Sequence, residues 1–440
     1  MNRHELSRGA LTKIQAIAII VIIVVAAAVG VVAFNWLTRP RVEETIKIGA
    51  ILQLAVPRGQ TSAEAARFWV NKINAEGGLL GRKVELIVED SKGDAKVCVT
   101  AHKKLVTEDR CILVITEGTG WTLPVMESAA ELYPEYPHLI MASYQGSLET
   151  TDKLKANYNK YKFFFTFDDG TLEDGRNFPK MAKEIFMDKA GYKKIALLIE
   201  DAAWSRPFMT GWPEYGLKPM KEMLKDYGFD VVYYATTDVN EKMFLPMFEA
   251  IAASGAECIL WVTVYTDTLT AVKQWARSSA KNLDLWITGG AVSMAAFWNQ
   301  SGGDCQGVLT WIPDAEVEIT DLTLPFIRAL RAKGLGLTEA AFQVYMPLLA
   351  FEAAVKKAGT LDVEKLIKTL EEIETPGPLG IIKFQSLNDY SPHRVVSGYP
   401  YYTQFTCQWQ NGKLVPVWPE PIRTKTNPDI DFVPVKKLRG

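Results

Sequence analysis

The residues best suited to hold a small molecule follow an apolar run at 112–115. There the chain reads TEGTGWT at 116–122, which joins hydroxyl groups, glycines, an aromatic side chain and the start of a helix. Free backbone amides at a helix start, together with hydroxyl groups, suit a carboxylate group. Thr119, Trp121 and Thr122 are therefore candidate ligand-binding residues. The alternative interpretation of the segment is a turn with an ordinary helix cap.

Similar polar and aromatic residues follow other apolar runs. Ser143 and Gln145 come after the run at 138–141, Trp204 comes after 194–199, and Tyr265 and Asp267 come after 258–264. In open α/β sheets, ligands bind outside the carboxyl ends of the strands, so these residues join the candidate site. Asp267 has two open interpretations, since its carboxylate suits either a ligand ammonium group or the cap of its own helix.

Enzyme motifs are missing from the sequence. It has no G-x-S-x-G, H-E-x-x-H, C-x-x-C or Walker pattern, and the glycines at 118 and 120 lack the third glycine of a dinucleotide fingerprint. We therefore predict a protein that is not an enzyme and that needs neither a cofactor nor a metal. We predict that His102 is a solvated surface residue, because it lies in a helical segment beside Lys103 and Lys104. The segment 90–94 predicts a strand-to-helix turn capped by Asp94, because a calcium loop would need a glutamate that is missing here.

Composition excludes other classes of protein. The 440 residues carry 49 Lys plus Arg and 51 Asp plus Glu, and no basic block lies beyond the first forty residues, so no nucleic-acid partner is expected. Five cysteines are too few and too scattered for a disulfide framework or a zinc cluster. An odd number leaves at least one thiol free or paired between chains. Cys98 and Cys111 are expected at opposite ends of one helix, and hence unpaired.

The elements that must position the candidate residues alternate between strands and helices. Strands are predicted at 46–52, 84–88, 112–115 and 138–141, with helices between them. The alternation restarts after 163–167, with strands at 194–199, 229–234, 258–264 and 285–288. Short connections and buried apolar strands favour parallel sheets with right-handed crossovers. The sequence therefore predicts an α/β protein with two doubly wound units.

An apolar segment precedes these units. Residues 16–34 contain no charge, and at about 1.5 Å per residue they nearly match a hydrocarbon core of about 30 Å. The segment is either a cleaved secretory signal or a retained anchor, and its length favours retention. Basic residues before it favour a cytoplasmic N-terminus, so we expect a single-pass anchor in the cell membrane with the body outside the cytoplasm. Residues 7–12 resemble the processing site of archaeal pilin-like signal peptides, with a cut after Gly9.

One stretch carries a family resemblance. The pattern N-x-x-G-G-L-x-G-R-x-V-x-L occupies 74–86, and the likeness continues through 287–313, 343–359 and GPLGIIKF at 377–384. The chain thus resembles the branched-chain amino-acid (Leu/Ile/Val) binding proteins of ABC transporters. The resemblance implies a type I periplasmic-binding-protein fold of two lobes joined by three crossings.

The resemblance also implies domain boundaries. We expect the crossings near Phe167, Gly290 and Ser397. Residues 1–41 would hold a stub, an anchor helix at about 14–37 and a linker. Lobe 1 would comprise 42–167 with 291–397, and lobe 2 would comprise 168–290 with 398–440.

The same resemblance implies roles for the candidate residues. Thr119 matches one of a pair of hydroxyl residues in the family, Gly118 replaces the other, and Ser143 and Gln145 match contacts at the next strand end. Trp204 matches a stacking aromatic residue, and Asp267 matches the carboxylate that meets the ligand ammonium.

Departures from the family pattern bear on the ligand. The segment 55–57 reads AVP, where relatives have TGP, and Glu117 adds a negative charge beside the expected carboxylate site. Trp121, Tyr144, Trp204 and Tyr265 together predict an aromatic pocket. We expect an amino acid or amide-like solute other than plain leucine.

The expected function is solute capture for an ABC importer. The partners would be the small-molecule solute, an ABC permease and the lipid bilayer. The alternative is a structural protein that forms filaments through its retained hydrophobic helix.

Overall fold

The computed structural model describes residues 45–439 except 144–145, 169, 203 and 337, and Thr45–Gly440 forms one compact unit. The predicted anchor at 16–34 and the predicted cut after Gly9 lie outside the described residues. Within the described part of the chain, no helix has both the length and the apolar character needed to cross a membrane.

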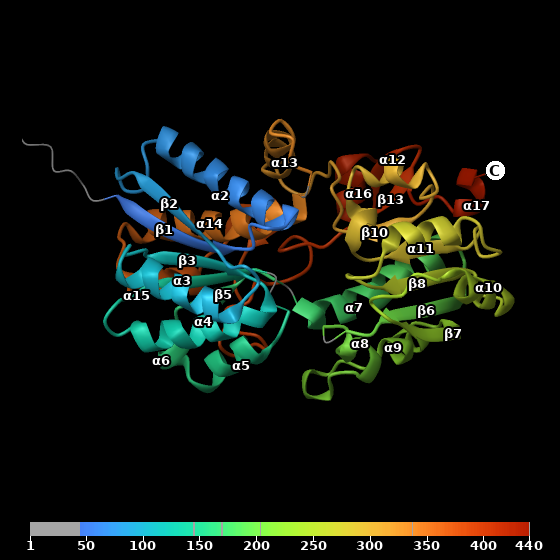
Figure 1. Cartoon of the computed structure of the whole chain (residues 1–440), viewed down its shortest axis with the longest axis horizontal. Coiled ribbons are helices and arrows are strands. Elements are labelled where there is room, and N and C mark those ends of the chain that lie inside the picture. The colour runs from blue at the N-terminus through green and yellow to red at the C-terminus, as the bar shows by residue number, and fades with distance from the viewer. Residues whose placement is uncertain (1–44, 144–145, 169, 203, 337, 440) are drawn as a thin grey trace, which may run out of the picture. The chain divides into compact units, whose positions relative to one another are not determined.

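The first sheet has five parallel strands in the order β2-β1-β3-β4-β5 (Figure 1). Its strands are β1 (Ile46–Leu52), β2 (Val84–Asp90), β3 (Leu113–Glu117), β4 (Leu139–Ser143) and β5 (Phe164–Thr166). Helices α2 (Pro57–Ala75) and α14 (Thr338–Ala358) pack together on one face, while α3 (Ala95–Thr107) and α4 (Thr119–Leu132) pack on the other. We call this sheet and its helices lobe 1.

Close packing in lobe 1 depends on a glycine in β1, which lies between β2 and β3. A Cβ atom at Gly49 would lie 2.8 Å from Leu105 Cδ1, so a larger residue would push α3 away from β1. The remaining elements of this part are α5 (Glu149–Ala156), α6 (Tyr158–Tyr161), α13 (Thr323–Arg331), α15 (Val363–Glu371), β11 (Thr375–Gly377) and β12 (Gly380–Ile382).

The second sheet has seven strands in the order β14-β13-β10-β9-β8-β6-β7. Its strands are β6 (Lys194–Glu200), β7 (Asp230–Thr237), β8 (Cys258–Val262), β9 (Asp284–Ile287), β10 (Leu309–Trp311), β13 (Thr406–Gln410) and β14 (Lys413–Trp418). Strands β6 to β10 pair in parallel, and β13 and β14 add an antiparallel edge, so the sheet is mixed. We call this sheet and its helices lobe 2.

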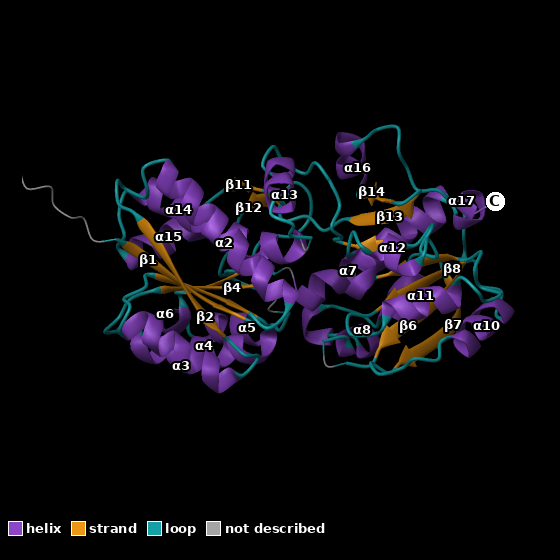
Figure 2. Ribbon diagram, turned by 45° about the horizontal axis from the view of Figure 1, so that its top comes forward, coloured by secondary structure: helices purple, strands orange, loops and turns teal. Residues whose placement is uncertain are grey.

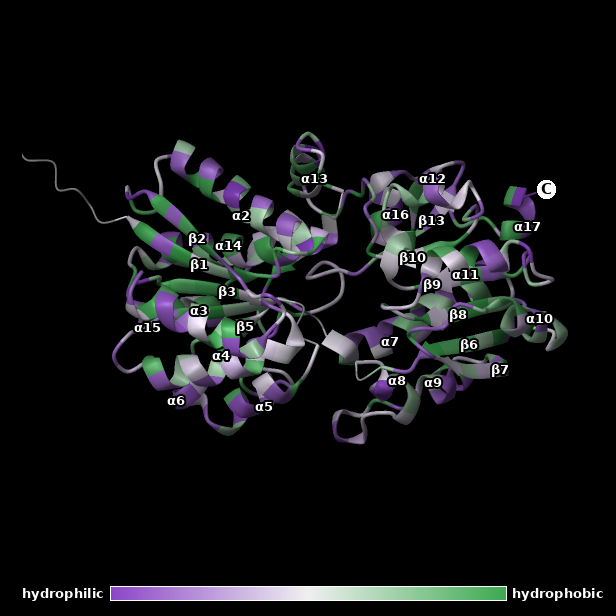
Figure 3. Cartoon of the chain, viewed as in Figure 1, coloured by the Kyte–Doolittle hydropathy of each residue, from purple (hydrophilic) through white to green (hydrophobic). Residues whose placement is uncertain are grey.

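Lobe 2 buries a separate apolar cluster on each face of its sheet. One cluster lies under α7 (Gly170–Ala182), the π-helix at Lys183–Lys189, α8 (Arg206–Thr210) and α9 (Met220–Asp226). The other lies under α10 (Leu245–Ala253), α11 (Thr268–Trp275) and α12 (Phe297–Ser301). Figure 2 shows helices on both faces of this sheet, and Figure 3 shows its apolar strands between them. The predicted α/β architecture with two lobes is therefore confirmed.

The second crossing lies later than the sequence suggested. We placed it near Gly290, but β10 pairs with β9 in the second sheet, so the chain leaves that sheet only after Trp311. The apolar run at 308–312 is too short for its sheet to be assigned from the sequence. Helix α4 begins at Thr119, within the segment 116–122 where the sequence analysis expects a helix start.

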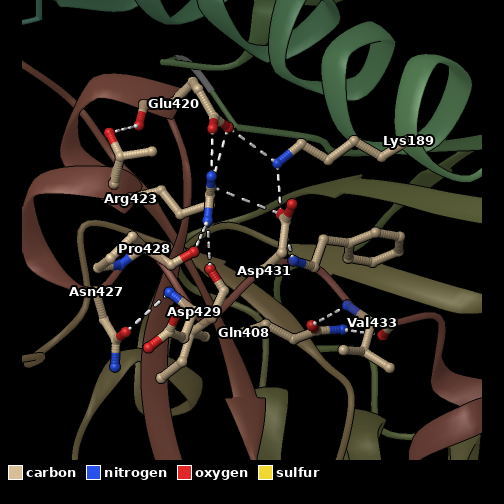
Figure 4. Close-up of polar contacts among 12 residues, drawn as sticks. Lys189, Gln408, Glu420, Arg423, Asn427, Pro428, Asp429, Asp431 and Val433 are labelled. Atoms are coloured by element: carbon tan, nitrogen blue, oxygen red, sulfur yellow. Dashed lines mark hydrogen bonds and ion pairs between the residues drawn. The ribbon is translucent and has the colours of Figure 1, made fainter.

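An ion-pair network attaches the C-terminal segment to lobe 2 (Figure 4). Lys189 Nζ lies 3.2 Å from Glu420 Oε2 and 2.5 Å from Asp431 Oδ1. The Arg423 guanidinium pairs with Glu420, and this hydrogen bond lowers the pKa of Glu420 to about 2. The Gln408 amide of β13 binds both the backbone N–H and the carbonyl of Val433. These contacts hold the segment after α16 (Glu420–Thr426) against the second sheet.

All five cysteines are buried and unpaired. The expectation that Cys98 and Cys111 do not form a disulfide is confirmed. Burial raises the pKa of the Cys98 thiol to about 11 and that of Cys111 to about 12, so both remain protonated at neutral pH.

The prediction for His102 was wrong. Its side chain is fully buried, and Nε2 lies 3.0 Å from His138 Nε2. The Tyr136 carbonyl can only accept, so it places a proton on His138 Nδ1 and leaves His138 Nε2 to accept from His102. His102 Nδ1 then accepts from the Ser128 hydroxyl. The prediction relied on the lysines that follow His102 in the sequence. Those lysines do not show that His102 itself lies on the buried face of α3.

This histidine pair predicts sensitivity to acid. Burial lowers the pKa of His102 to about 3 and that of His138 to about 4, whereas both would titrate near 6.5 in the unfolded chain. The stabilising contribution is therefore present above pH 6.5 and is lost as pH falls toward 4, by about 1.4 kcal/mol per pH unit for each histidine. Urea unfolding of the wild type and of His102→Gln at pH 7 and pH 5 measures this change. In His102→Gln, the fall in the free energy of unfolding between pH 7 and pH 5 should be smaller than in the wild type by the contribution of one histidine. An equal fall in both proteins would contradict the assignment.

Candidate functional site

Lobe 1 brings the ends of β3 and β4 together at the carboxyl edge of its sheet. Glu117 lies opposite Ser143 in the parallel register, and the Gly118 N–H donates to the Ser143 carbonyl at 2.9 Å. Thr119 is exposed, and its Oγ1 accepts from the backbone N–H of Gly146 at 3.2 Å. The fold thus places Thr119 and Ser143 side by side, as the sequence predicted for strand ends.

Gly118 sets the direction of α4. Its φ of +94° favours glycine, and a Cβ atom there would lie 2.5 Å from the Trp121 ring. The Trp121 ring therefore folds back over the start of its own helix. Thr122 is fully buried, and its hydroxyl donates to the Gly118 carbonyl at 2.7 Å, so this hydrogen is already used within the helix.

Three polar groups of the candidate residues are buried without a hydrogen-bond partner among the described residues. They are the Ser143 hydroxyl, the Trp121 indole N–H and the Trp204 indole N–H. Leaving such a group unsatisfied costs about 1–3 kcal/mol, and an indole N–H can only donate. Each group is therefore available to an acceptor that arrives from outside the chain. Gln145 and Tyr144 lie outside the described residues.

Lobe 2 presents its candidates beyond the ends of β6 and β8. Trp204 is partly buried and packs edge-on against Phe208, with ring centroids 5.5 Å apart. Tyr265 is 67% exposed. Strands β6 and β8 are neighbours, so both aromatic residues lie at the carboxyl edge of the second sheet.

Asp267 caps its own helix. Its Oδ1 accepts from the Thr270 N–H at 3.1 Å, and its Oδ2 accepts from the Thr270 hydroxyl at 2.9 Å and lies 3.1 Å from Lys242 Nζ. Burial raises the pKa of this carboxyl, but the hydrogen bonds from Thr270 and Lys242 outweigh burial and lower it overall. The capping interpretation is therefore confirmed, while a role toward a ligand ammonium stays a prediction.

Two buried glutamates shape these edges, and the sequence did not single out either role. Glu117 accepts from the Gln53 N–H at 3.1 Å and from the Ser62 hydroxyl at 3.2 Å. Burial raises the pKa of Glu117, while those bonds and Arg58 act in the opposite direction. Glu200 accepts from the N–H groups of Val264 and Tyr265 at 2.6 and 2.9 Å. In the sequence, these roles could have been recognised from a glutamate at the last position of a buried strand.

Comparison with known proteins gives a consistent family. The profile of a family described as periplasmic binding protein matches residues 45–397. The Leu/Ile/Val-binding protein homolog 3 of Brucella melitensis is 23% identical over 84% of this chain and 93% of its own length.

Solved structures share the fold at low identity. A putative branched-chain amino acid ABC transporter protein from Silicibacter pomeroyi matches with a TM-score of 0.74 at 19% identity, covering 89% of this chain and 99% of that one. A solute-binding protein from R. palustris, solved with 4-hydroxybenzoate, matches with a TM-score of 0.61 at 18% identity, covering 84% and 95%.

The cap formed by Asp267 gives a stability prediction. Asp267→Ala removes the acceptor for the first turn of α11 and should lower the free energy of unfolding by about 1 kcal/mol. Lys242→Ala removes only an exposed ion pair and should change that free energy by less than about 1 kcal/mol. Urea titrations of both variants without any solute test the assignment. Equal small effects would show that the cap contributes little.

Proposed function

Since the chain belongs to the periplasmic binding protein family, we propose that it is the extracytoplasmic solute-binding protein of an ABC importer. In this proposal the carboxyl edges of the two lobes close on the solute by a hinge motion, and the loaded protein delivers the solute to its permease. We propose that lobe 1 comprises 42–167 with 312–397, and that lobe 2 comprises 168–311 with 398–440. The boundary after 311 follows from β10, which joins the second sheet.

The observation that carries the proposal is the set of unsatisfied polar groups among the candidate residues at the carboxyl edges of the sheets. Ser143, Trp121 and Trp204 each bury a hydrogen-bonding group that finds no partner within the described chain. Open α/β sheets bind ligands at this edge, and the two indole rings supply apolar walls beside their donors. Thr119 adds an exposed hydroxyl oxygen at the same edge.

We propose an amino acid or amide-like solute. Relatives are named for leucine, isoleucine and valine, and several structural neighbours were solved with aromatic acids, so a screen must include both classes. Glu117 at the end of β3 disfavours a simple carboxylate there, because it is buried close to Thr119. Tyr265, Gln145 and Asp267 remain proposed contacts of the same site.

We also propose that residues 16–34 anchor the protein in the cell membrane, with the body outside. The support is the uncharged length of the segment and the basic residues before it. Intact-mass measurement of the protein from native membranes distinguishes a retained helix from a cleaved one. Ordered fibres in those membranes would favour the filament alternative.

The proposal predicts that a solute stabilises the protein. In a thermal-shift screen of the full chain in detergent, a ligand at a hundred times its dissociation constant should add about 2.7 kcal/mol of stability. Trp204→Ala should abolish this shift, because it removes the stacking ring and an indole donor.

Tyr227→Ala is a suitable control for that screen. Tyr227 is exposed beyond the end of α9, before the amino end of β7, and its loss should leave the shift unchanged. If no amino acid, amide or aromatic acid stabilises the wild type, the proposed solute classes are wrong.

A further inference from the structure

One loop of lobe 2 contacts lobe 1. It comprises residues 211–217 between α8 and α9, it contains a short 3₁₀ helix (Pro213–Tyr215), and we call it the latch loop. The Tyr215 hydroxyl donates to Asp152 Oδ2 in α5 at 2.6 Å. Helix α8 follows β6 of the second sheet, whereas α5 follows β4 of the first, so this hydrogen bond joins the two lobes. Figure 1 shows α5 on the side of lobe 1 that faces α8.

The latch loop is held in one shape by its own contacts. The Trp212 and Leu217 backbones exchange two hydrogen bonds, of 2.6 and 3.1 Å. The Tyr215 N–H donates to the Trp212 carbonyl, and the two rings pack edge to face with centroids 5.4 Å apart. Gly211 permits the turn, because its φ is +76° and a Cβ atom there would lie 2.7 Å from the Leu217 carbonyl oxygen. The loop therefore holds Tyr215 in position without help from lobe 1.

A small apolar cluster covers the same junction. Leu148 of lobe 1 packs with Leu172 and Leu217 of lobe 2, and each of the three is at most 2% exposed. Partly buried aromatic side chains surround them, namely Trp212, Tyr215 and Tyr390. Gly175 in α7 leaves room for Leu217, since a Cβ atom there would lie 2.9 Å from Leu217 Cδ2. The cluster is separate from the cores of both lobes, so it stabilises the contact between them.

A second polar contact crosses the junction through Tyr390. Its hydroxyl donates to Glu173 Oε1 in α7 of lobe 2. The neighbouring Ser391 hydroxyl donates to Thr151 of α5 at 3.1 Å, which fixes the Tyr390 segment to lobe 1. The junction therefore has hydrogen bonds in both directions, one from each lobe.

Arg176 of α7 connects the two polar contacts. Its Nη1 lies 2.6 Å from Glu173 Oε1, and its Nη2 donates to the Tyr215 carbonyl at 3.2 Å. The guanidinium carbon also lies 4.9 Å from the centroid of the Tyr390 ring, within the range of a cation–π interaction. One side chain thus contacts the latch loop, its own helix and the lobe 1 segment.

The latch loop is close in sequence to the candidate site on both sides. It directly follows α8, whose Phe208 packs against Trp204. In lobe 1, Leu148 comes two residues after Gly146, whose N–H donates to Thr119. The contacts of the latch loop therefore act on the segments that carry candidate ligand-binding residues at the two carboxyl edges.

We propose that the latch loop limits how far the two lobes separate before a solute arrives. A larger separation would part Tyr215 from Asp152 and expose the apolar surface of Leu148 and Leu217 to water. The contacts therefore favour a narrow range of lobe spacings in the ligand-free protein. This inference goes beyond the proposed function and rests on it only for the hinge motion between the lobes.

Spin-label distances test the latch loop on the full chain in detergent. The labels are attached to Lys103→Cys in lobe 1 and Lys281→Cys in lobe 2, which are exposed positions, whereas the native cysteines are buried. Without solute, Tyr215→Phe should make the distance distribution at least about one and a half times as broad, because it removes a hydroxyl that joins the lobes. Asp152→Ala should have the same effect, and the double variant should add little to it.

Tyr158→Phe is the matched control. The Tyr158 hydroxyl donates to Glu371 at 2.6 Å, which is the same kind of hydrogen bond at the same distance, but both residues belong to lobe 1. This variant should keep the wild-type distance distribution, even where it lowers the melting temperature as much as Tyr215→Phe does. A purely stabilising role of Tyr215 would make the two variants alike in both measurements.

Two outcomes would overturn the inference. An unchanged distribution in both Tyr215→Phe and Asp152→Ala would show that the lobe spacing does not depend on this contact. Equal broadening in Tyr158→Phe would show that the broadening reports a general loss of stability. Neither outcome involves a solute, so a failure of every solute in the thermal-shift screen would contradict the proposed function and leave the distance result to decide the latch loop.

Discussion

A buried glutamate ends an interior strand in each lobe, and the loops at the carboxyl edges of both sheets depend on it. Glu117 at the end of β3 holds Gln53, and Glu200 at the end of β6 holds the loop at Val264 and Tyr265. Both carboxylates are fully buried, so each must satisfy its charge with N–H and O–H donors from neighbouring loops. These bonds order the loops that would otherwise be free to move at the carboxyl edges. The position of the Tyr265 backbone follows directly from this constraint.

Much of the fold could be predicted because parallel strands are apolar on both faces. The run at 46–52 and the glycine pair at 77–78 each indicate a strand or a helix end without knowledge of distant contacts. Strand β10 was missed because it has three residues and joins its sheet only through partners far away in sequence. Its place determines which lobe the segment after Gly290 joins.

The candidate site was harder to predict than the fold, because the role of each side chain depends on which other residues it contacts. Asp267 looked equally fit for a ligand or a helix cap, and only the positions of Thr270 and Lys242 decide what it contacts. Thr122 carries a suitable hydroxyl, but helical geometry directs it to the Gly118 carbonyl. Glu117 and Glu200 bind donors about sixty residues away, at Gln53 and Val264. Spacing along one sequence does not reveal such partners.

The unsatisfied buried polar groups have a common energetic meaning. A fold selected for stability alone would satisfy or remove the Ser143 hydroxyl, the two indole donors and the Gln343 carbonyl oxygen, since each costs about 1–3 kcal/mol. Because the lobes have large apolar cores, they tolerate this loss. The unsatisfied donors and the unsatisfied acceptor are therefore the groups at which a bound solute would recover free energy that folding leaves unused.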